Sequence, residues 1–209
     1  VSAGNNGTAA LYPPANDPFV ITVGATDDKG TSALTDDVIA TFSAYGTTTD
    51  GFKKPDLVAP GRNIVGRMVN ANMGMAQAHP SNVLSSTYFK MSGTSVSAPI
   101  VSGAVALLLQ DEPNLTPDQV KYRLIATANK SWSGYNATKA GAGTLDVYAA
   151  IKGTTTASSN TGIAVSNLLM TGSNSILMPT VNWNSVNWNS VNWNSVNWIR
   201  RIETAASYL

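Results

Sequence analysis

The most constraining feature of the sequence is a run of small and polar residues, 93–99 (Gly-Thr-Ser-Val-Ser-Ala-Pro), that leads directly into an apolar segment. Residues 100–109 are largely apolar and predict one helix. A serine where a helix begins keeps a free hydroxyl and an N–H that the helix leaves unpaired, above the positive end of the helix dipole. The pattern alone therefore fits two roles for Ser95, a nucleophile or a residue that caps a core helix.

Two further residues of this predicted helix carry structural expectations. Pro99 is predicted in the first turn, where its missing N–H costs little. Gly103 lies deeper, where a glycine costs about 1 kcal/mol relative to alanine. We therefore expect Gly103 to allow another segment to approach the helix closely.

The run Gly-Thr-Ser-Val-Ser-Ala-Pro, followed by a small-residue apolar helix, resembles the serine box of the subtilisin-like serine peptidases. The resemblance implies that Ser95 is the nucleophile and that its backbone N–H is one donor to the oxyanion. Val96 and Ser97 stand where methionine and alanine are more usual in the family. Ser97 also occupies the second-glycine position of the Gly-x-Ser-x-Gly elbow, which argues against an α/β-hydrolase.

The beginning of the chain supplies a second match. Residues 1–7 predict a strand that runs into a glycine-rich turn, and an Asn-Gly pair by itself fits an ordinary turn. Placed upstream of the serine box, Ser-Ala-Gly-Asn resembles the family's Ala-Ala-Gly-Asn segment. The resemblance implies that Asn5, rather than Asn6, is the side-chain donor to the oxyanion. It also implies that Ser2, Ala3 and Gly4 form one wall of the pocket for the substrate residue preceding the cut.

The rest of the peptidase-like region is scaffold. Residues 19–25 predict a buried strand, and residues 116–119 (Thr-Pro-Asp-Gln) predict a helix start with a capping box. Three stretches resemble landmark segments of the family: 41–46, 54–61 and 141–151. The resemblance covers about residues 1–152. It implies an α/β, three-layer subtilisin-like fold with a mainly parallel sheet, of which this chain is an incomplete C-terminal portion.

A serine peptidase also needs an imidazole base and a carboxylate that holds the base in position. His79 is the sole histidine. Its context, Gln-Ala-His-Pro, lacks the small-residue helix start of the family's His-Gly-Thr-His segment. His79 also follows the oxyanion segment, whereas subtilisins run Asp, His, Ser. We therefore reject His79 as the base. We expect the catalytic Asp and His to lie upstream of Val1, in the N-terminal half of the domain. Val1 is then interpreted as the site of a truncation or of processing.

Composition narrows the remaining functions. Charged residues make up 12% of the chain, about half the usual ~25%, and the net charge is +1 with no basic run. Nucleic acid is therefore not an expected partner. No apolar run approaches the ~18 residues of a membrane span. The chain has no cysteine, which excludes disulfides and thiolate chemistry. The resemblance implies an extracellular or cell-surface location, although no signal peptide is present in these residues.

The resemblance implies a polypeptide substrate and no cofactor for the chemistry. It allows a structural calcium ion near the strand at 19–25, with ligands, and hence any metal site, left unknown. We interpret the aspartate pairs at 27–28 and 36–37 as solvated loop charges.

The C-terminal quarter differs in composition. Residues 153–180 predict a Thr/Ser/Asn-rich linker, and residues 181–198 repeat Val-Asn-Trp-Asn-Ser, followed by a tail at 199–209. A tryptophan every five residues gives no single apolar face on a strand or a helix. We favour a tail that associates nonspecifically through its tryptophans, and binding to carbohydrate or a cell wall is the alternative. The chain as a whole is thus predicted to be a serine endopeptidase. The competing class is a non-catalytic binding or secretion module in which the Trp repeat carries the role.

Overall fold

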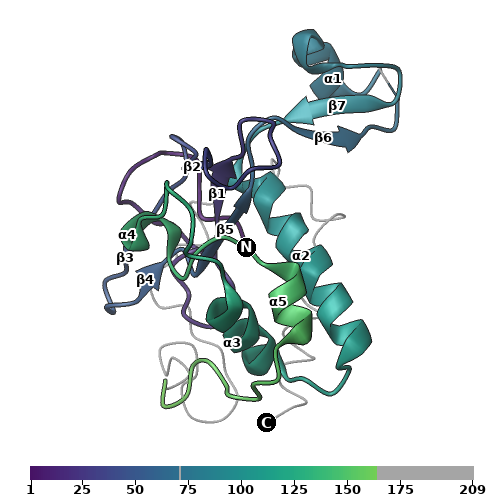
Figure 1. Ribbon diagram of the computed structural model, residues 1–209. Coiled ribbons are helices and arrows are strands. Elements are labelled where there is room, and N and C mark those ends of the chain that lie inside the picture. The colour runs from purple at the N-terminus through teal and green to yellow at the C-terminus, as the bar shows by residue number, and fades with distance from the viewer. Residues whose placement is uncertain (71, 164–209) are drawn as a thin grey trace, which may run out of the picture. The chain divides into compact units, whose positions relative to one another are not determined.

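A three-stranded sheet lies at the centre of the structure (Figure 1). This computed structural model describes residues 1–70 and 72–163. The strands lie in the order β2 (Val38–Ile39), β1 (Val23–Asp27) and β5 (Leu57–Pro60). β1 and β5 pair in parallel, and β2 is antiparallel to β1. Isolated parallel bridges add Ser2 beside β1 and Thr144 beside β5, so the sheet is mainly parallel, as predicted.

The remaining elements follow in chain order. They are β3 (Gly46–Thr47), β4 (Lys53–Lys54), β6 (Ile64–Arg67), α1 (Gly74–Ala78), the 3-10 helix η1 (Pro80–Asn82), β7 (Tyr88–Met91), α2 (Thr94–Asp111), α3 (Pro117–Thr127), α4 (Ala137–Ala140) and α5 (Val147–Lys152). β3 pairs with β4 and β6 pairs with β7, both in antiparallel fashion. Part of the predicted linker, and all of the Trp repeat and tail, lie outside the described residues.

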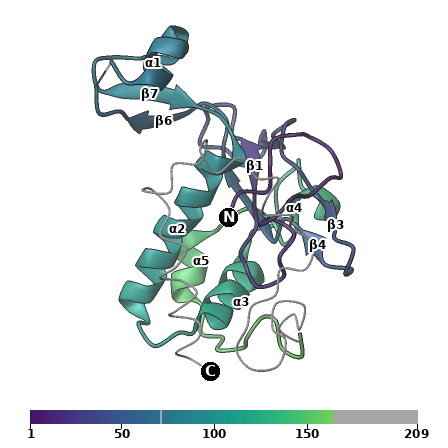
Figure 2. The ribbon, with the colours of Figure 1, turned by 180° about the vertical axis from the view of Figure 1, so that it is seen from behind.

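Both faces of the sheet are covered, which confirms the three-layer prediction. Successive residues of a strand point to opposite faces. Leu57 and Ala59 of β5 pack into a cluster with α2, α3 and α5, whereas Val58 packs with Trp132 and Ala140. Figures 1 and 2 show α2, α3 and α5 grouped on one side, with α4 away from them.

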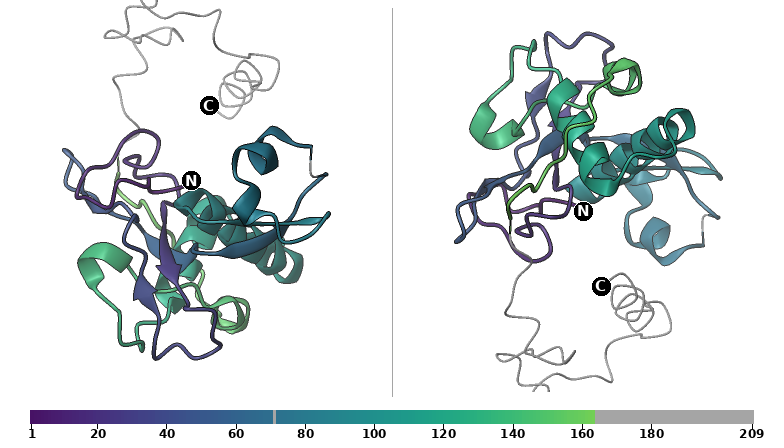
Figure 3. Two further views of the ribbon diagram at one scale, coloured as in Figure 1. Left: turned by 90° about the horizontal axis from the view of Figure 1, so that it is seen from above. Right: turned by 90° about the horizontal axis from the view of Figure 1, so that it is seen from below.

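The β6–β7 hairpin projects from the rest of the described structure. Figure 3 shows it extending sideways beyond the end of α2, with α1 at its outer part. It carries a small cluster of its own, made by Met68, Ala76 and Phe89. The hairpin therefore buries apolar side chains without help from the central sheet.

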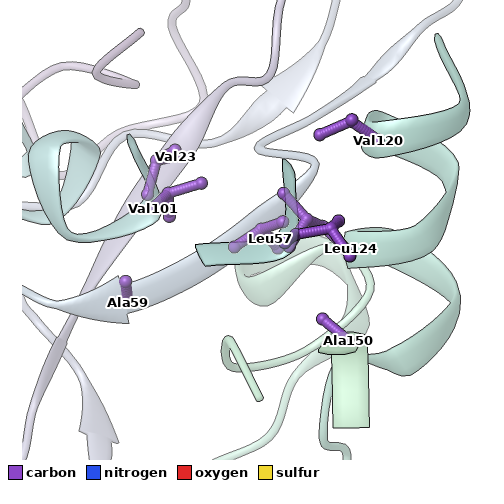
Figure 4. Close-up of a cluster of buried hydrophobic side chains, with 8 residues drawn as sticks. Val23, Leu57, Ala59, Val101, Val120, Leu124 and Ala150 are labelled. Carbon is purple, nitrogen blue, oxygen red and sulfur yellow. The ribbon is translucent and has the colours of Figure 1, made fainter. Parts of the chain in front are cut away.

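The main core lies between the sheet and its helices (Figure 4). Strands β1 and β5 contribute small and branched side chains, and each of the three helices contributes one or two more. Its buried members are Val23, Leu57, Ala59, Val101, Leu108, Val120, Leu124 and Ala150. Because β-branched and small residues dominate the strand side, the helices can approach the sheet closely.

Helix α2 is longer than predicted. It begins at Thr94, so Ser95 lies in its first turn and Pro99 lies within the helix. The prediction of Pro99 in the first turn was therefore wrong. Since a proline has no N–H, the carbonyl of Ser95 lacks the usual helical donor four residues on.

The predicted start of α3 is confirmed. Thr116 is its N-cap, and Pro117 is its first residue. The Thr116 hydroxyl accepts the Gln119 N–H at 3.3 Å, and the Gln119 side chain accepts the Thr116 N–H at 2.8 Å. This reciprocal pair is the capping box that the sequence indicated.

Among residues 1–70 and 72–163, α2 is the one helix whose length and hydropathy would allow it to cross a membrane. Core helices meet the same criteria, and α2 packs against β1, β5 and α5. Its opposite face stays exposed, including Ser102, Gly103, Ala106 and Leu107. The helix therefore has one packed face and one open face, both largely apolar.

Four aspartates, at 27–28 and 36–37, were predicted to be solvated loop charges. Two of them are buried, contrary to this prediction. Asp27 is 7% exposed and Asp37 is 5% exposed. Burial opposes ionisation of Asp27, but bonds from Lys29 and the charges of Lys29 and Arg62 outweigh it and lower its pKa. Asp37 has no ion pair within the described residues, and burial, with the charges of neighbouring aspartates, raises its pKa.

A second buried polar network joins the start of the chain to α3. The Lys54 ammonium donates to the Val20 carbonyl at 3.1 Å and to Asp56 Oδ2 at 2.8 Å. The Lys121 ammonium donates to the Val20 and Pro18 carbonyls and lies 3.4 Å from Asp56 Oδ1. Burial lowers the pKa of Lys54, and Asp56 opposes that shift. One carboxylate therefore serves two buried ammonium groups.

Arg123 holds the segment that follows α5. Its guanidinium is fully buried, pairs with Glu112 and donates to the carbonyls of Ala150, Gly153 and Thr155. The first residues of the predicted linker are thus bonded to α3.

We expect Asp56→Asn to lower the free energy of unfolding by about 3 kcal/mol or more. The reason is that two buried ammonium groups lose their counter-charge. Denaturant unfolding measures the loss. Asp50→Asn, an exposed change of the same kind, should have almost no effect. Equal effects of the two substitutions would contradict this account.

Candidate active site

The first turn of α2 presents the hydroxyl of Ser95 to solvent. Gly93 precedes the helix with φ of 152°, a conformation that favours glycine, and its N–H donates to the Gly61 carbonyl at 2.8 Å. The side chain of Ser95 is exposed, and neither its Oγ nor its N–H bonds to another described residue. Both groups are therefore available to a ligand.

Asn5 lies against this turn, and its amide orientation is fixed. Asn5 Oδ1 accepts the Thr94 N–H and the Thr94 hydroxyl, each at 2.9 Å. The Thr94 hydroxyl in turn accepts the Gly4 N–H at 3.1 Å. A backbone N–H can only donate, so the amide atom that faces it must be the oxygen. The Nδ2 group is thereby left to donate elsewhere.

Asn5 and Ser95 face one small space. A methyl group built at Gly93 would lie 3.2 Å from Asn5 Nδ2 and 3.3 Å from Ser95 Oγ. The structure thus brings together the two residues that the sequence marked as nucleophile and oxyanion donor. Because Gly93 has no side chain, this space stays open.

Residues 2–4 lie next to Asn5, beside β1. Ser2 bridges Val23 in parallel, and the Ala3 N–H donates to the Val23 carbonyl at 2.9 Å. Ala3 is buried, whereas Ser2 and Gly4 are partly exposed. The segment is therefore anchored to the sheet, with Asn5 at its end.

The structure does not bring His79 to Ser95. His79 follows α1, in the part of the hairpin beyond the paired strands, whereas Met91 at the other end of β7 leads to Ser95. Three strand steps from Tyr88 to Met91 alone span about 10 Å. No hydrogen bond joins His79 to Ser95 among the described residues.

Sequence reasoning missed the contact that fixes the start of α2. A Cβ at Gly61 would lie 2.2 Å from Ser97 Oγ, 2.7 Å from Ala25 Cβ and 3.1 Å from the Gly93 carbonyl oxygen. Ser97 is fully buried, and its hydroxyl has no hydrogen-bond partner in the described part of the chain. The start of α2 thus packs closely against the middle of β1 and the residue that follows β5. The Pro-Gly pair at 60–61 was the available signal.

Two cavities in the described residues lie apart from Ser95 and Asn5. One, about 330 Å³, is lined by Asp28, Asp37 and Asp146 among others, and one of about 210 Å³ is lined by Lys54 and Lys121 among others. No group of three or more His, Cys, Asp or Glu side chains in residues 1–70 and 72–163 is arranged to hold a metal ion. The structural calcium ion that the resemblance allowed stays a prediction, with its ligands unknown.

Comparisons with known proteins cover most of the described residues. The family model described as the subtilase family, Peptidase_S8, matches residues 1–146. Serine protease AprX of Bacillus subtilis is 39% identical over 155 residues, covering 73% of this chain and 35% of AprX. C5a peptidase of Streptococcus pyogenes is 35% identical over 92 residues, covering 44% of this chain and 7% of that peptidase.

Solved structures of proteases also resemble this chain. Fervidolysin from Fervidobacterium pennivorans, described as a keratinolytic enzyme related to subtilisin, superposes with a TM-score of 0.55 at 32% identity. That match covers 74% of this chain and 22% of fervidolysin. The prenylagaramide maturation protease PagA gives a TM-score of 0.54 at 31% identity, over 72% of this chain and 48% of PagA. This chain spans about a third of AprX and less than half of each of these two structures.

We expect Gly61→Ala to destabilise the fold by about 1–3 kcal/mol, because the new methyl group would overlap Ser97 and Ala25. Thermal unfolding measures the effect. Gly66→Ala is the matched control, since a Cβ at Gly66 meets nothing within 4 Å. An unfolding midpoint unchanged by Gly61→Ala would show that α2 is not held by this contact.

Proposed function

Because this chain belongs to the subtilase family, we propose that it carries the nucleophile and the oxyanion-binding part of a serine endopeptidase. Ser95 is the nucleophile, and Asn5 is the side-chain donor. The observation that carries the proposal is the locked amide of Asn5, whose Nδ2 faces the same space as Ser95 Oγ. A donor fixed before the substrate arrives needs no reorganisation during the reaction.

The proposed reaction proceeds through an acyl-enzyme. Ser95 Oγ attacks the carbonyl carbon of the scissile peptide bond while a histidine base takes the hydroxyl proton. The carbonyl oxygen becomes negative and accepts hydrogen bonds from Asn5 Nδ2 and the Ser95 N–H, at the positive end of α2. The histidine then protonates the leaving amine, and water releases the acyl group by the reverse sequence.

Ser2, Ala3 and Gly4 form one wall of the proposed pocket for the residue before the cut. Their anchoring to β1 supports this role, because a fixed wall selects side chains better than a mobile one. The substrate is a polypeptide, and the chemistry uses no cofactor. Family membership also supports an extracellular or cell-surface location for this chain.

The catalytic histidine and aspartate are proposed to come from polypeptide outside this chain. His79 lies at the wrong end of its hairpin, and this chain spans about a third of AprX. The open face of α2 offers a place for the missing part. Leu107 is 50% exposed, and a methyl group at Gly103 would meet no described atom within 4 Å. We propose that the segment expected to approach Gly103 closely belongs to the polypeptide outside this chain.

We call this chain joined to the region that supplies the histidine and aspartate the completed enzyme. In it, we expect Asn5→Ala to lower kcat by about 10²–10³-fold with little change in KM, because the donor acts on the transition state. Subtilisin's own asparagine is the reference case for this magnitude. Steady-state kinetics on a peptide substrate measure both constants. Asn6→Ala is the control, since the Asn6 side chain bonds only within its own turn, to Ala10 and Thr8. A raised KM with unchanged kcat would remove Asn5 from the oxyanion site.

We expect a fluorophosphonate probe, which labels activated serines, to leave Ser95 unlabelled in this chain alone. Joined to an upstream region that supplies the histidine and aspartate, the chain should be labelled, and Ser95→Ala should abolish the label. A serine hydroxyl without a positioned base is a weak nucleophile. Labelling of the chain alone that is lost in His79→Ala would instead make His79 the base.

A further inference from the structure

The β6–β7 hairpin leads into the nucleophile and has two different faces. In the register of the pair, Ile64 lies opposite Met91 and Gly66 opposite Phe89. Phe89 is buried, and Met91 packs against the same cluster. These four residues make up the inner face. The hairpin is therefore anchored by this face and leaves the other one open.

The open face carries Val65, Arg67, Tyr88 and Lys90, which we call the outer strip. Val65 lies opposite Lys90, and Arg67 lies opposite Tyr88, so the four side chains share one side of the pair. Val65 is 52% exposed and Tyr88 is 50% exposed. Arg67 is exposed, and Lys90 is partly exposed. The outer strip thus alternates cationic with aliphatic and aromatic surface.

The positive charge of the outer strip is not neutralised nearby. The sequence has no Asp or Glu between positions 57 and 110. Arg62, at the base of the hairpin, pairs with Asp27, whereas neither Arg67 nor Lys90 has an ion pair within the described residues. An unpaired cationic side chain attracts carboxylates, and arginine binds them with two parallel hydrogen bonds.

The outer strip lies within reach of a substrate bound at Ser95. Lys90 precedes Ser95 by five residues, so their Cα atoms are at most about 18 Å apart. An extended substrate advances about 3.3 Å per residue. Lys90 is therefore within about five substrate residues of the bond that is cut, and Arg67 and Tyr88 lie roughly two residues further along the hairpin.

We propose that the outer strip binds an acidic segment of the polypeptide substrate, on one side of the cleaved bond. The proposal rests on the function proposed above, because it assigns a substrate class to the same site. Arg67 and Lys90 pair with substrate carboxylates, and Tyr88 and Val65 contact the apolar side chains between them. The inner face, where Phe89 and Met91 pack, takes no part.

The test uses the completed enzyme and three peptides that are identical around the cleaved bond and differ only on one side of it, about three to seven positions away, where the residues are Glu, Gln or Lys. The double variant Arg67→Glu/Lys90→Glu should lower kcat/KM for the Glu peptide about tenfold and raise it for the Lys peptide. The Gln peptide should change little. Because the pairs are exposed, the preference for Glu should weaken as salt is raised.

The matched control is Lys53→Glu/Lys130→Glu, which changes the net charge equally at two exposed lysines outside the hairpin. It should leave the order of the three peptides unchanged. Equal effects of the two double variants would show that the preference for Glu depends only on the net charge of the protein, and would overturn the proposal. So would a wild-type enzyme that cleaves all three peptides equally.

Two readouts separate this proposal from the proposed function. Fluorophosphonate labelling of Ser95 in the wild type and both double variants shows whether the site is active. If labelling fails in the completed wild type, the proposed function is wrong. The outer strip is then still tested by the fluorescence anisotropy of the Glu and Lys peptides with the Ser95→Ala form. Tighter binding of the Glu peptide, lost in Arg67→Glu/Lys90→Glu, supports the strip, and equal binding overturns it.

Discussion

The bonds that Thr94 makes with the start of the chain hold the proposed active site in its observed arrangement. One residue donates twice to Asn5 Oδ1 and accepts from the Gly4 N–H, across about ninety positions of sequence. Residues 2–4 are simultaneously paired with β1, and α2 packs on β1 and β5. Leaving one of these partly buried groups unsatisfied costs about 1–3 kcal/mol, so the sheet, the helix start and Asn5, the proposed oxyanion donor, are stabilised together.

Features with a local signal could be predicted from the sequence. The serine box, the helix after it and the Thr116 capping box are contiguous patterns, and the structure has all of them. Asn5 was distinguished from Asn6 by resemblance, and the structure sets Asn5, not Asn6, against Thr94. The predicted start of this helix was less accurate. Pro99 suggested the first turn, whereas the first turn lies further upstream, where Asn5 bonds to Thr94 and Gly61 bonds to Gly93.

Features made by distant residues gave no local signal. The buried aspartates looked like loop charges because the partners of Asp27 include Arg62, thirty-five positions away. Lys54 is two positions from Asp56 in the sequence, but only the fold brings Lys121 to the same carboxylate. The close fit between Gly61 and Ser97 joins a turn to a helix that are separate in the chain. Spacing and periodicity describe one element at a time, so contacts between elements escape them.

Pro99 removes one hydrogen bond between the first turn of α2 and the rest of the helix. The missing N–H interrupts the hydrogen-bond ladder just beyond Ser95, so the turn gains little from the long helix behind it. Asn5, Gly4 and Gly61 bond to the start of this turn and to Gly93 before it, and these bonds do not depend on helix propagation. The amides of the first turn should therefore exchange with solvent deuterium sooner than those after Pro99. The position of Ser95, the proposed nucleophile, therefore depends on contacts outside its own helix as well as on the helix itself.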